Sequence, residues 1–273
     1  MLGNPVAHSQ SPFIHTEFAR QTGQAMSYGR ELCALDGFEA ALQHFADSGG
    51  RGCNVTVPFK FEACRLASWR SAAAELAGAA NVLARVDGGW HASNTDGAGL
   101  VQDIEHNAGV VLQGLRVLLV GAGGAGAGVL GPLLQARPSA LVLANRSQDK
   151  AVALAERHQP LARQHGVALT VAPLAEPGLA FDVLMNASAS SLQGLPSPVP
   201  ASALRPGTLA IDLMYGAAAE PFLRWAQAHG AVARDGLGML VEQAAGAFEV
   251  WRGLRPATVP VLAALRQRLA AAA

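Results

Sequence analysis

Three polar residues in the first half of the chain, Lys60, Asn81 and Asp96, are of the types that can transfer a proton and hold a hydroxyl group. The Asp-Gly-Gly sequence at 87–89 lies between two apolar stretches and predicts a β-hairpin. Pairing across this turn places Asn81 opposite Thr95 or Asp96, so an amide and a carboxylate converge. Lys60 lies just beyond a predicted strand, and its amine can reach the same cleft. The group suits proton transfer, although a Lys–Asp contact can equally be a solvated ion pair.

The chemistry that suits this group is the reduction of a ketone. As hydride arrives, the ketone oxygen becomes negative and needs a proton, which a positioned lysine supplies with a gain of about 10² to 10⁴ in rate. Asp96 would hold Lys60 and a substrate hydroxyl in place. Ser9 and Ser11 lie at the start of a predicted helix, with Ser11 as N-cap and Pro12 in the first helical position. Free N–H groups and the helix dipole favour an anion there, so we expect a substrate carboxylate at these serines.

Gly121, Gly123 and Gly126 have the spacing of a dinucleotide-binding turn, in which small residues permit the tight turn, the approach of the pyrophosphate and helix-to-strand packing. The motif follows an apolar strand and opens a helix, and the next strand ends about 20 residues later, as such a site requires. A glycine-rich packing turn is the alternative. The absence of a following Gly-Lys-Ser/Thr sequence argues against a nucleoside-triphosphate loop. Gly124 and Ala125 complete the expected contact with the dinucleotide.

The next strand ends in Asn145-Arg146-Ser147, where many dinucleotide sites carry an acidic residue. A carboxylate there binds the ribose 2′-hydroxyl of NAD but repels the 2′-phosphate of NADP. Arg146 would instead attract the 2′-phosphate of NADP, and Asn145 and Ser147 would add neutral hydrogen-bond donors to it. Lys150, one turn along, adds a second positive charge. One or two charge-assisted hydrogen bonds, worth roughly 1.5 to 3 kcal/mol each, favour NADP by about ten-fold to several thousand-fold. The alternative is a solvated helix start.

Short apolar runs alternate with helical stretches from Arg116 onward, which indicates a doubly wound, Rossmann-type parallel sheet with helices on both faces. The expected strands are 117–120, 140–144, 167–171, 181–186, 208–213 and 231–234. The sheet is complete before the last helices, so we expect these helices to return to the first domain. The predicted fold class is therefore α/β with two domains. Residues 1–98 plus 239–273 form a substrate domain with a mostly parallel sheet, and residues 99–238 form the NADP domain.

The composition excludes several classes of partner. Twenty basic and twenty acidic residues give no net charge, so no nucleic acid or anionic membrane is expected, and the partner should be a small molecule. The odd set Cys33, Cys53 and Cys64 has no metal-ligand spacing and predicts buried thiols in a reducing compartment, with no metal site. No secretory signal is recognisable, so we expect a cytoplasmic protein. Residues 117–136 are long and uncharged enough to span a bilayer, but their glycines favour strand, turn and helix.

Several motifs together resemble the shikimate dehydrogenases along nearly the whole chain. They are GNPVAHSQSP (3–12), NVTVPFK (54–60), GAAN (78–81), NTDG (94–97), GAGGAG (121–126), NRS (145–147) and GLGMLVEQ (236–243). The resemblance implies the reversible reduction of 3-dehydroshikimate to shikimate with NADPH, in the pathway through chorismate to the aromatic amino acids. It also implies the two-domain fold in which the last helices return to the first domain, and a monomer or a homodimer.

By position, Lys60 and Asp96 match the family's catalytic pair. Residues that match its substrate contacts are Ser9, Ser11 and Tyr215 for the carboxylate, and Thr56, Lys60, Asn81, Asp96 and Gln243 for the ring. Residues that match its contacts with NADP(H) are Gly121, Gly123, Gly124, Ala125, Gly126, Asn145, Arg146, Ser147, Lys150, Asn186, Met214, Gly236 and Met239.

The chain departs from the family pattern at three places. After Tyr215, the sequence GAAAEP replaces a proline and a threonine of the family. Only Met1 and Leu2 precede Gly3, where the family usually has a longer strand, so we expect the natural start to lie upstream. Ser191 replaces a glycine in the loop after Asn186, and this loop is expected to differ in conformation without touching a proton donor. Two other functions stay open. One is a quinate/shikimate dehydrogenase of broader specificity, and the other is a non-catalytic NADP-binding sensor with little need of the Lys60 group.

Overall fold

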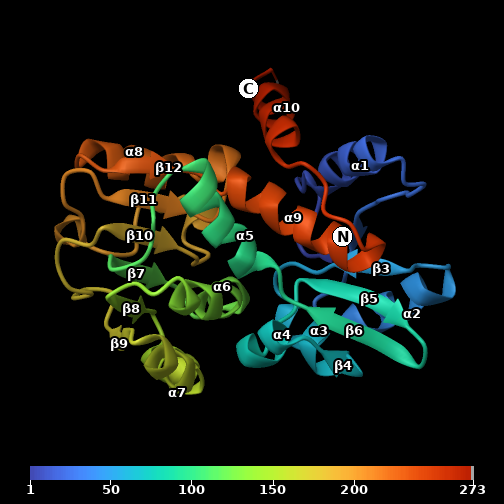
Figure 1. Ribbon diagram of the computed structural model, residues 1–273, viewed down its shortest axis with the longest axis horizontal. Coiled ribbons are helices and arrows are strands. Elements are labelled where there is room, and N and C mark those ends of the chain that lie inside the picture. The colour runs from blue at the N-terminus through green and yellow to red at the C-terminus, as the bar shows by residue number, and fades with distance from the viewer. Residues whose placement is uncertain (272–273) are drawn as a thin grey trace. The chain divides into compact units, whose positions relative to one another are not determined.

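The computed structural model describes residues 1–271, and the chain divides into two compact units (Figure 1). Unit 1 contains residues 1–99 and the described residues from Leu240 on, and unit 2 is Leu100–Met239. The sequence analysis places Gly99 in the NADP domain and Met239 in the substrate domain. In the structure, Gly99 belongs to unit 1 and Met239 to unit 2. Met239 consequently belongs to the same unit as every other residue predicted to bind the cofactor.

Unit 1 contains short strands in two sheets. They are β1 (Leu2–Gly3), β2 (Glu31–Leu32), β3 (Gly52–Asn54), β4 (Trp69–Arg70), β5 (Val82–Val86) and β6 (Gly89–Ser93). β1 pairs with β2 in parallel, and the second sheet has the order β3-β5-β6-β4. The β5–β6 hairpin forms as predicted, and its pairing and the β3–β5 pairing are antiparallel. The prediction of a mostly parallel sheet is therefore wrong for the larger sheet, in which only the β4–β6 pairing is parallel, because the hairpin and β3 pair antiparallel. The two-stranded β1–β2 sheet is parallel.

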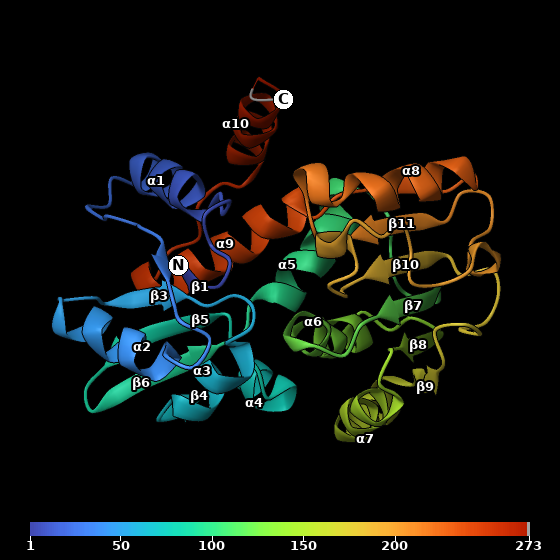
Figure 2. The ribbon, with the colours of Figure 1, turned by 180° about the vertical axis from the view of Figure 1, so that it is seen from behind.

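The helices of unit 1 cover these sheets and include the end of the chain. They are α1 (Ser11–Thr22), α2 (Phe38–Asp47), α3 (Lys60–Leu66), α4 (Ala72–Ala77), the start of α5 (Asp96–Gln102), most of α9 (Leu237–Arg252) and α10 (Val259–Ala270). α10 packs against α1 in both views, which confirms that the closing helices return to the first domain (Figures 1 and 2). The three cysteines are free and buried, as predicted.

Unit 2 is built on a sheet in which every pairing is parallel. Its strands are β7 (Arg116–Val120), β8 (Ala140–Ala144), β9 (Ala168–Ala172), β10 (Val183–Asn186), β11 (Leu209–Asp212) and β12 (Val232–Arg234), in the order β12-β11-β10-β7-β8-β9. The chain runs from β7 outward to β9, returns to β10 and then runs outward to β12. The direction of winding therefore reverses between β7 and β10, and ligands of such sheets bind at the carboxyl ends of the strands beside this point.

Helices flank this sheet along its length. They are the π-helix η1 (Asp103–Asn107), α6 (Gly124–Gln135), α7 (Gln148–His165), α8 (Glu220–Ala228) and the short 3₁₀ helices η2 (Ser191–Gln193), η3 (Ala201–Ala203) and η4 (Gly216–Ala218). α7 packs on β8 and β9, and α8 packs on β11 and β12. The uncharged stretch 117–136 consists of β7, a turn and α6, as predicted. Within residues 1–271, no helix combines the length and apolarity needed to cross a bilayer.

Candidate active site

The residues predicted to transfer a proton are in direct contact in unit 1. Lys60 is the first residue of α3 and Asp96 the first residue of α5. Lys60 Nζ donates to Asp96 Oδ2 at 2.5 Å, and the two side chains are only 12% and 6% exposed. A pair this well shielded differs from the solvated ion pair that spacing alone allowed, because water competes little for either charge.

Asn81 fixes the other side of the aspartate. Its Nδ2 donates to Asp96 Oδ1 and to Gln243 Oε1, each at 2.9 Å, and its Oδ1 accepts from the backbone N–H of Thr95 at 2.8 Å. Both carboxylate oxygens of Asp96 therefore have a donor, Lys60 on one and Asn81 on the other. Gln243 enters this group from α9, far along the chain.

The hairpin register predicted from the turn is wrong, although the contact it predicted exists. Val82 pairs with Ser93, so the ladder continued by one residue would place Asn81 opposite Asn94 rather than Thr95 or Asp96. Asn81 reaches Asp96 because the chain turns into α5 immediately after the strand. The side chain of Asn94 supports this turn, since its Oδ1 accepts from the N–H of Asp96 at 3.1 Å.

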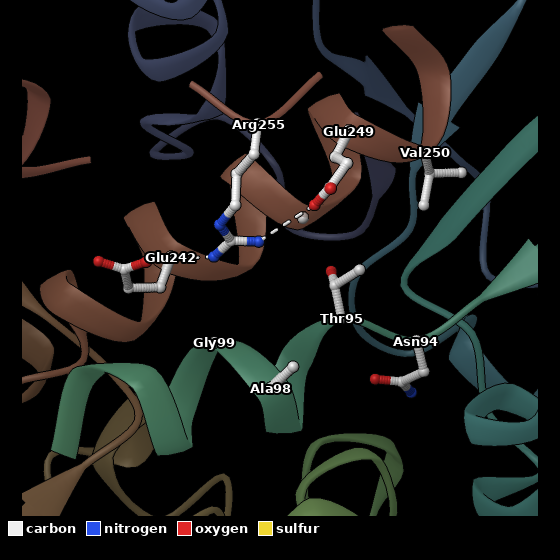
Figure 3. A pocket seen from close by; sticks show the side chains of 9 residues that line it. Asn94, Thr95, Ala98, Gly99, Glu242, Glu249, Val250 and Arg255 are labelled. Atoms are coloured by element: carbon white, nitrogen blue, oxygen red, sulfur yellow. Dashed lines mark hydrogen bonds and ion pairs between the residues drawn. The ribbon is translucent and has the colours of Figure 1, made fainter. Parts of the chain in front are cut away.

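A cavity of about 310 Å³ lies beside this group, between α5 and α9 of unit 1 (Figure 3). Thr95 and Gly99 line it, and Arg255 forms ion pairs with Glu242 and Glu249, each at 3.4 Å, on the α9 side. Neither Lys60 nor Asp96 lines the cavity. The contact of Lys60 with Asp96 is therefore distinct from the cavity, whose charged lining is internally paired.

Ser9 and Ser11 lie together at the start of α1. Ser9 Oγ donates to Ser11 Oγ at 3.1 Å, and Ser11 N–H donates to Ser9 Oγ at 3.3 Å. The predicted N-cap is wrong: Ser11 is the first helical residue, and Gln10 occupies the cap without a side-chain cap bond. Arg30, which the sequence analysis did not single out, donates twice to the carbonyl of Ser9, at 2.9 and 2.7 Å.

Thr56 and Tyr215, the remaining predicted substrate residues, lie in different units. Thr56 sits between β3 and Lys60, and its N–H donates to Leu2 O at 3.0 Å. It packs tightly on Gly3, where an added Cβ would lie 2.3 Å from Thr56 Cγ2. Tyr215 precedes η4 in unit 2, so its contact with the carboxylate stays a prediction.

Beneath α1 lies a buried polar group that the sequence analysis missed. Asn54 Oδ1 accepts from Tyr28 Oη at 2.6 Å and faces His15 Nε2 at 3.2 Å, while Asn54 Nδ2 donates to Asn81 O at 3.2 Å. His15 therefore carries its proton on Nε2, and its Nδ1 has no partner among the described residues. Asn54 opens the NVTVPFK motif, which was the one available signal for this group.

We expect the neutral state of His15 to make the protein less stable in acid. Burial, with a smaller contribution from the N-terminal amine, lowers the pKa of His15 from 6.5 to about 3. The unfolded chain binds the proton near pH 6.5 and the folded chain does not, so stability is complete above this pH and falls below it, by at most about 1.4 kcal/mol per pH unit. Burial also lowers the pKa of His158, which is fully buried in α7, and its contribution has the same sign.

Urea unfolding of the wild type and of His15→Gln at pH 7.5 and 5.5 measures this effect. The glutamine keeps a donor for Asn54 but does not titrate, so the variant should lose less unfolding free energy between the two pH values. The half-exposed His165, at the end of α7, provides the matched control His165→Gln. Equal pH dependence in His15→Gln and the wild type would contradict the assignment.

The glycine-rich turn after β7 has the geometry of a dinucleotide site, and each glycine has a separate reason to be there. Gly121 has a φ of 114°, in the left-handed region. At Gly126 an added Cβ would lie 1.9 Å from Gly121 O, so only glycine lets α6 pack against the strand. At Gly123 an added Cβ would meet nothing within 4 Å. The backbone at Gly123 is therefore open to a ligand, beside the free N–H groups of Gly124 and Ala125 at the start of α6.

These differences predict opposite outcomes for two alanine substitutions. Gly123→Ala should leave stability unchanged or raise it by about 0.4 to 1 kcal/mol, because φ −82° and ψ −172° suit alanine. Its methyl group should nevertheless raise the Kd for NADP at least about ten-fold, since it stands where the pyrophosphate approaches. Gly126→Ala should lower the melting temperature through its clash with Gly121. Calorimetric titration and thermal melting measure both, and wild-type NADP affinity in Gly123→Ala would contradict the prediction.

The cluster predicted to bind a 2′-phosphate lies at the start of α7. Arg146, Ser147 and Lys150 are exposed, and Ser147 is the N-cap without a side-chain cap bond. Asn145 links this cluster to the glycine turn, because its Oδ1 accepts from Ala122 N–H at 3.2 Å and its Nδ2 donates to Ser147 O at 2.8 Å. Asn145 thus supports both parts of the predicted site.

The other predicted cofactor residues lie at the ends of β10 and β11 and beyond. Asn186 is 1% exposed, and its side chain bonds only to protein groups, including Asp212 Oδ2 at 3.0 Å. Met214 and Gly236 are joined, since Gly236 N–H donates to Met214 O at 2.8 Å. Met239 is buried at the start of α9. Residues on five segments of unit 2 are thus gathered at the carboxyl edge of its sheet.

Comparison with known proteins decides the family. The profile "Shikimate dehydrogenase substrate binding domain" matches residues 1–83, "Shikimate / quinate 5-dehydrogenase" matches residues 103–205, and "Shikimate 5′-dehydrogenase C-terminal domain" matches residues 236–266. The NADP(+)-dependent shikimate dehydrogenase of Acidovorax sp. (strain JS42) is 59% identical over 273 residues, which cover 100% of this chain and 97% of that protein. The chain belongs to the shikimate dehydrogenase family.

Solved structures of similar proteins share the two-unit α/β fold. An Ael1 enzyme from Pseudomonas putida has 47% sequence identity and a TM-score of 0.86, with 97% of this chain and 96% of that chain covered. The shikimate 5-dehydrogenase of Thermus thermophilus, solved with NADP(H) and shikimate, has 33% identity and a TM-score of 0.82, with 97% of each chain covered. The resemblance read from the motifs is thereby confirmed, and so is the predicted fold class.

Proposed function

We propose that this member of the shikimate dehydrogenase family catalyses the reversible reduction of 3-dehydroshikimate to shikimate with NADPH, in the biosynthesis of chorismate and the aromatic amino acids. The observation that carries the proposal is the shielded contact of Lys60 with Asp96, held by Asn81. A protein that only sensed NADP would need the glycine turn of unit 2 but not a lysine fixed in this way.

The proposed mechanism divides the work between hydride and proton. NADPH, when bound, supplies a hydride to the ketone carbon of the substrate. The ammonium group of Lys60 donates a proton to the ketone oxygen as this oxygen becomes negative, and takes the proton back in the reverse direction. Asp96 keeps the lysine in place through its 2.5 Å bond and offers its carboxylate to a ring hydroxyl, while Asn81 prevents the carboxylate from turning.

The rest of the substrate is assigned to neighbouring polar groups. Ser9 and Ser11 would bind the carboxylate, and the helix dipole of α1 favours an anion at the serines. Thr56 and Gln243 would bind ring hydroxyls together with Asn81. Arg30 would act indirectly, by fixing the backbone of Ser9.

Unit 2 fits NADP in three respects. The open backbone at Gly123 and the free N–H groups of α6 suit a pyrophosphate. The exposed Arg146 and Lys150 suit a 2′-phosphate. Gly236, Met214 and Met239 would line the nicotinamide side. The buried Asn186 is assigned a supporting role rather than a contact, because its amide is already bonded within the protein.

The initial rate of NADPH formation from shikimate and NADP tests the proposal, with NAD and quinate as parallel reagents. We expect a fast rate only with shikimate and NADP. The second candidate is a quinate/shikimate dehydrogenase, which is favoured by the family profile that names both substrates. Comparable rates with quinate would support this candidate. A folded protein that binds NADP but turns over neither substrate would contradict both and indicate a sensor.

We further propose that the enzyme works in the cytoplasm as a monomer or a homodimer, with a small molecule as its partner. The three free, buried cysteines suit a reducing compartment, and the neutral net charge suits a small-molecule partner. Cell fractionation and light scattering of the purified protein test the two statements separately.

A further inference from the structure

Asp212, at the end of β11, is a fully buried carboxylate for which the proposed mechanism has no use. No lysine or arginine of residues 1–271 forms an ion pair with it, although buried carboxylates usually have such a partner. Burial raises the pKa of Asp212, and its hydrogen-bond donors oppose this effect. A buried charge with only neutral partners requires a specific reason.

The hydrogen-bond donors around Asp212 explain why a carboxylate is buried at this position. Asp212 Oδ1 accepts from Met214 N–H at 2.8 Å, and Oδ2 accepts from Asn186 Nδ2 at 3.0 Å and from Ser191 Oγ. Three donors on two different segments therefore converge on one side chain. A carboxylate can accept all of them, whereas an asparagine would turn its own NH₂ group toward one of the donors.

The segment held in this way is the serine loop, which we define as residues 187–191. Asn186 Oδ1 accepts from the N–H and the Oγ of Ser188, at 3.1 and 2.6 Å. The other end of the loop is fixed by Ser191, whose Oγ bonds both to Asp212 and to Asn186 Nδ2, the latter at 3.0 Å. Ser191 is 2% exposed, so solvent hardly competes for these bonds.

The serine loop lies directly against the glycine turn. An added Cβ at Gly121 would lie 2.9 Å from the carbonyl group of Ala187 and from Ser188 N. Ala187 N–H also donates to Val120 O at 2.8 Å, immediately before the turn. A shift of the serine loop would therefore move or loosen the turn, and Asp212 connects this loop with Met214.

We propose that Ser191 and Asp212 form an anchor that positions the serine loop against Gly121 and Met214, and that this anchor sets the affinity of the protein for NADP. The backbone of Ser191 is not left-handed, so the anchor carries no backbone strain. Ser191 and Asp212 are positioning residues, and the inference rests on the NADP binding assigned in the proposed function.

The test is the Kd for NADP of Ser191→Ala and Ser191→Gly, measured by calorimetric titration, which requires no turnover. Loss of a charge-assisted hydrogen bond that orders the loop should raise this Kd about three-fold to thirty-fold. The matched control is Ser190→Ala, since Ser190 Oγ bonds to Asn186 at 3.2 Å but not to Asp212. Ser191→Thr keeps the hydroxyl and should restore the wild-type Kd.

Titration with a second ligand distinguishes a change in the position of the serine loop from a general loss of structure in unit 2. Adenosine 2′,5′-bisphosphate lacks the nicotinamide half, so its Kd should change less than that of NADP in Ser191→Ala. The KM for shikimate should also stay near the wild-type value while the KM for NADP rises.

Unchanged NADP affinity in Ser191→Ala, or an equal loss in Ser190→Ala, would overturn the anchor. Equal loss for both ligands would overturn it as well, because a generally loosened unit would then explain the result. A wild-type protein that binds NADP but does not oxidise shikimate would overturn the proposed function and leave the anchor standing. One that binds no NADP would overturn both.

Discussion

Lys60→Ala should lower kcat for shikimate oxidation by about 10² to 10⁴, the usual contribution of a positioned proton donor, while the Kd for NADP stays at the wild-type value. The separation is expected because Lys60 and Asp96 bond to each other in unit 1, whereas every residue assigned to NADP lies in unit 2. The loss should be largest in kcat, since the proton is needed only when charge develops on the oxygen. Steady-state rates and a direct titration with NADP measure the two quantities.

The chain provides a matched control for this substitution. It contains only two lysines, Lys60 and Lys150. Lys150→Ala also removes one positive charge, but from the exposed start of α7, and should raise the Kd for NADP with little effect on kcat at saturating cofactor. If Lys60→Ala kept wild-type kcat, the proton would have another donor. If it lost NADP binding instead, the separation of roles between the two units would be wrong.

The parts of the fold that sequence predicted well are those governed by local rules. Strands 117–120 and 140–144 were placed to within a residue, because apolar runs buried in a parallel sheet leave a strong pattern. The glycine turn is equally predictable, because its glycines are required by contacts between residues close together in the chain. Gly126, for example, packs on Gly121 of the same turn.

The predictions that are wrong concern features that the tertiary structure determines. The register of the β5–β6 hairpin was missed by one step because the turn has two residues between the paired Val86 and Gly89, which a glycine-rich sequence does not specify. Its residue type predicts Ser11 as an N-cap, but the helix begins at Ser11 itself.

The candidate site likewise combines residues that the local sequence marks with residues that only the tertiary fold brings together. The contact among Lys60, Asn81 and Asp96 is predictable because each residue lies beside a strand end or turn that the sequence marks. The residues that support this group, Asn54 and Tyr28, are not predictable from the sequence, because they meet only when distant segments fold together. Ser191 was recognised as a departure from the family but discounted because it is no proton donor. Its bond to Asp212 is the contact on which the proposed anchor of the serine loop depends.

Arg146→Ala should remove most of the preference for NADP. At the start of α7 the helix dipole disfavours cations, and only Asp149 in the first turn has the favoured charge. Arg146 and Lys150 are nevertheless placed there, and neither forms an ion pair within the described residues. Two unpaired cations at an unfavourable position are best explained by an anion that binds them, and the 2′-phosphate is the anion that distinguishes NADP from NAD.

Loss of one such bond should lower kcat/KM with NADP by about 10- to 150-fold and leave kcat/KM with NAD nearly unchanged, so that the ratio of the two reports the phosphate contact alone. Arg157→Ala is the control, because Arg157 is exposed farther along the same helix and its removal changes the net charge equally. A similar drop in Arg157→Ala would mean that the general charge of α7, rather than a contact, attracts the cofactor. Equal losses with NADP and NAD in Arg146→Ala would place the arginine away from the 2′-phosphate, and the choice of cofactor would then have to come from Ser147 or Lys150.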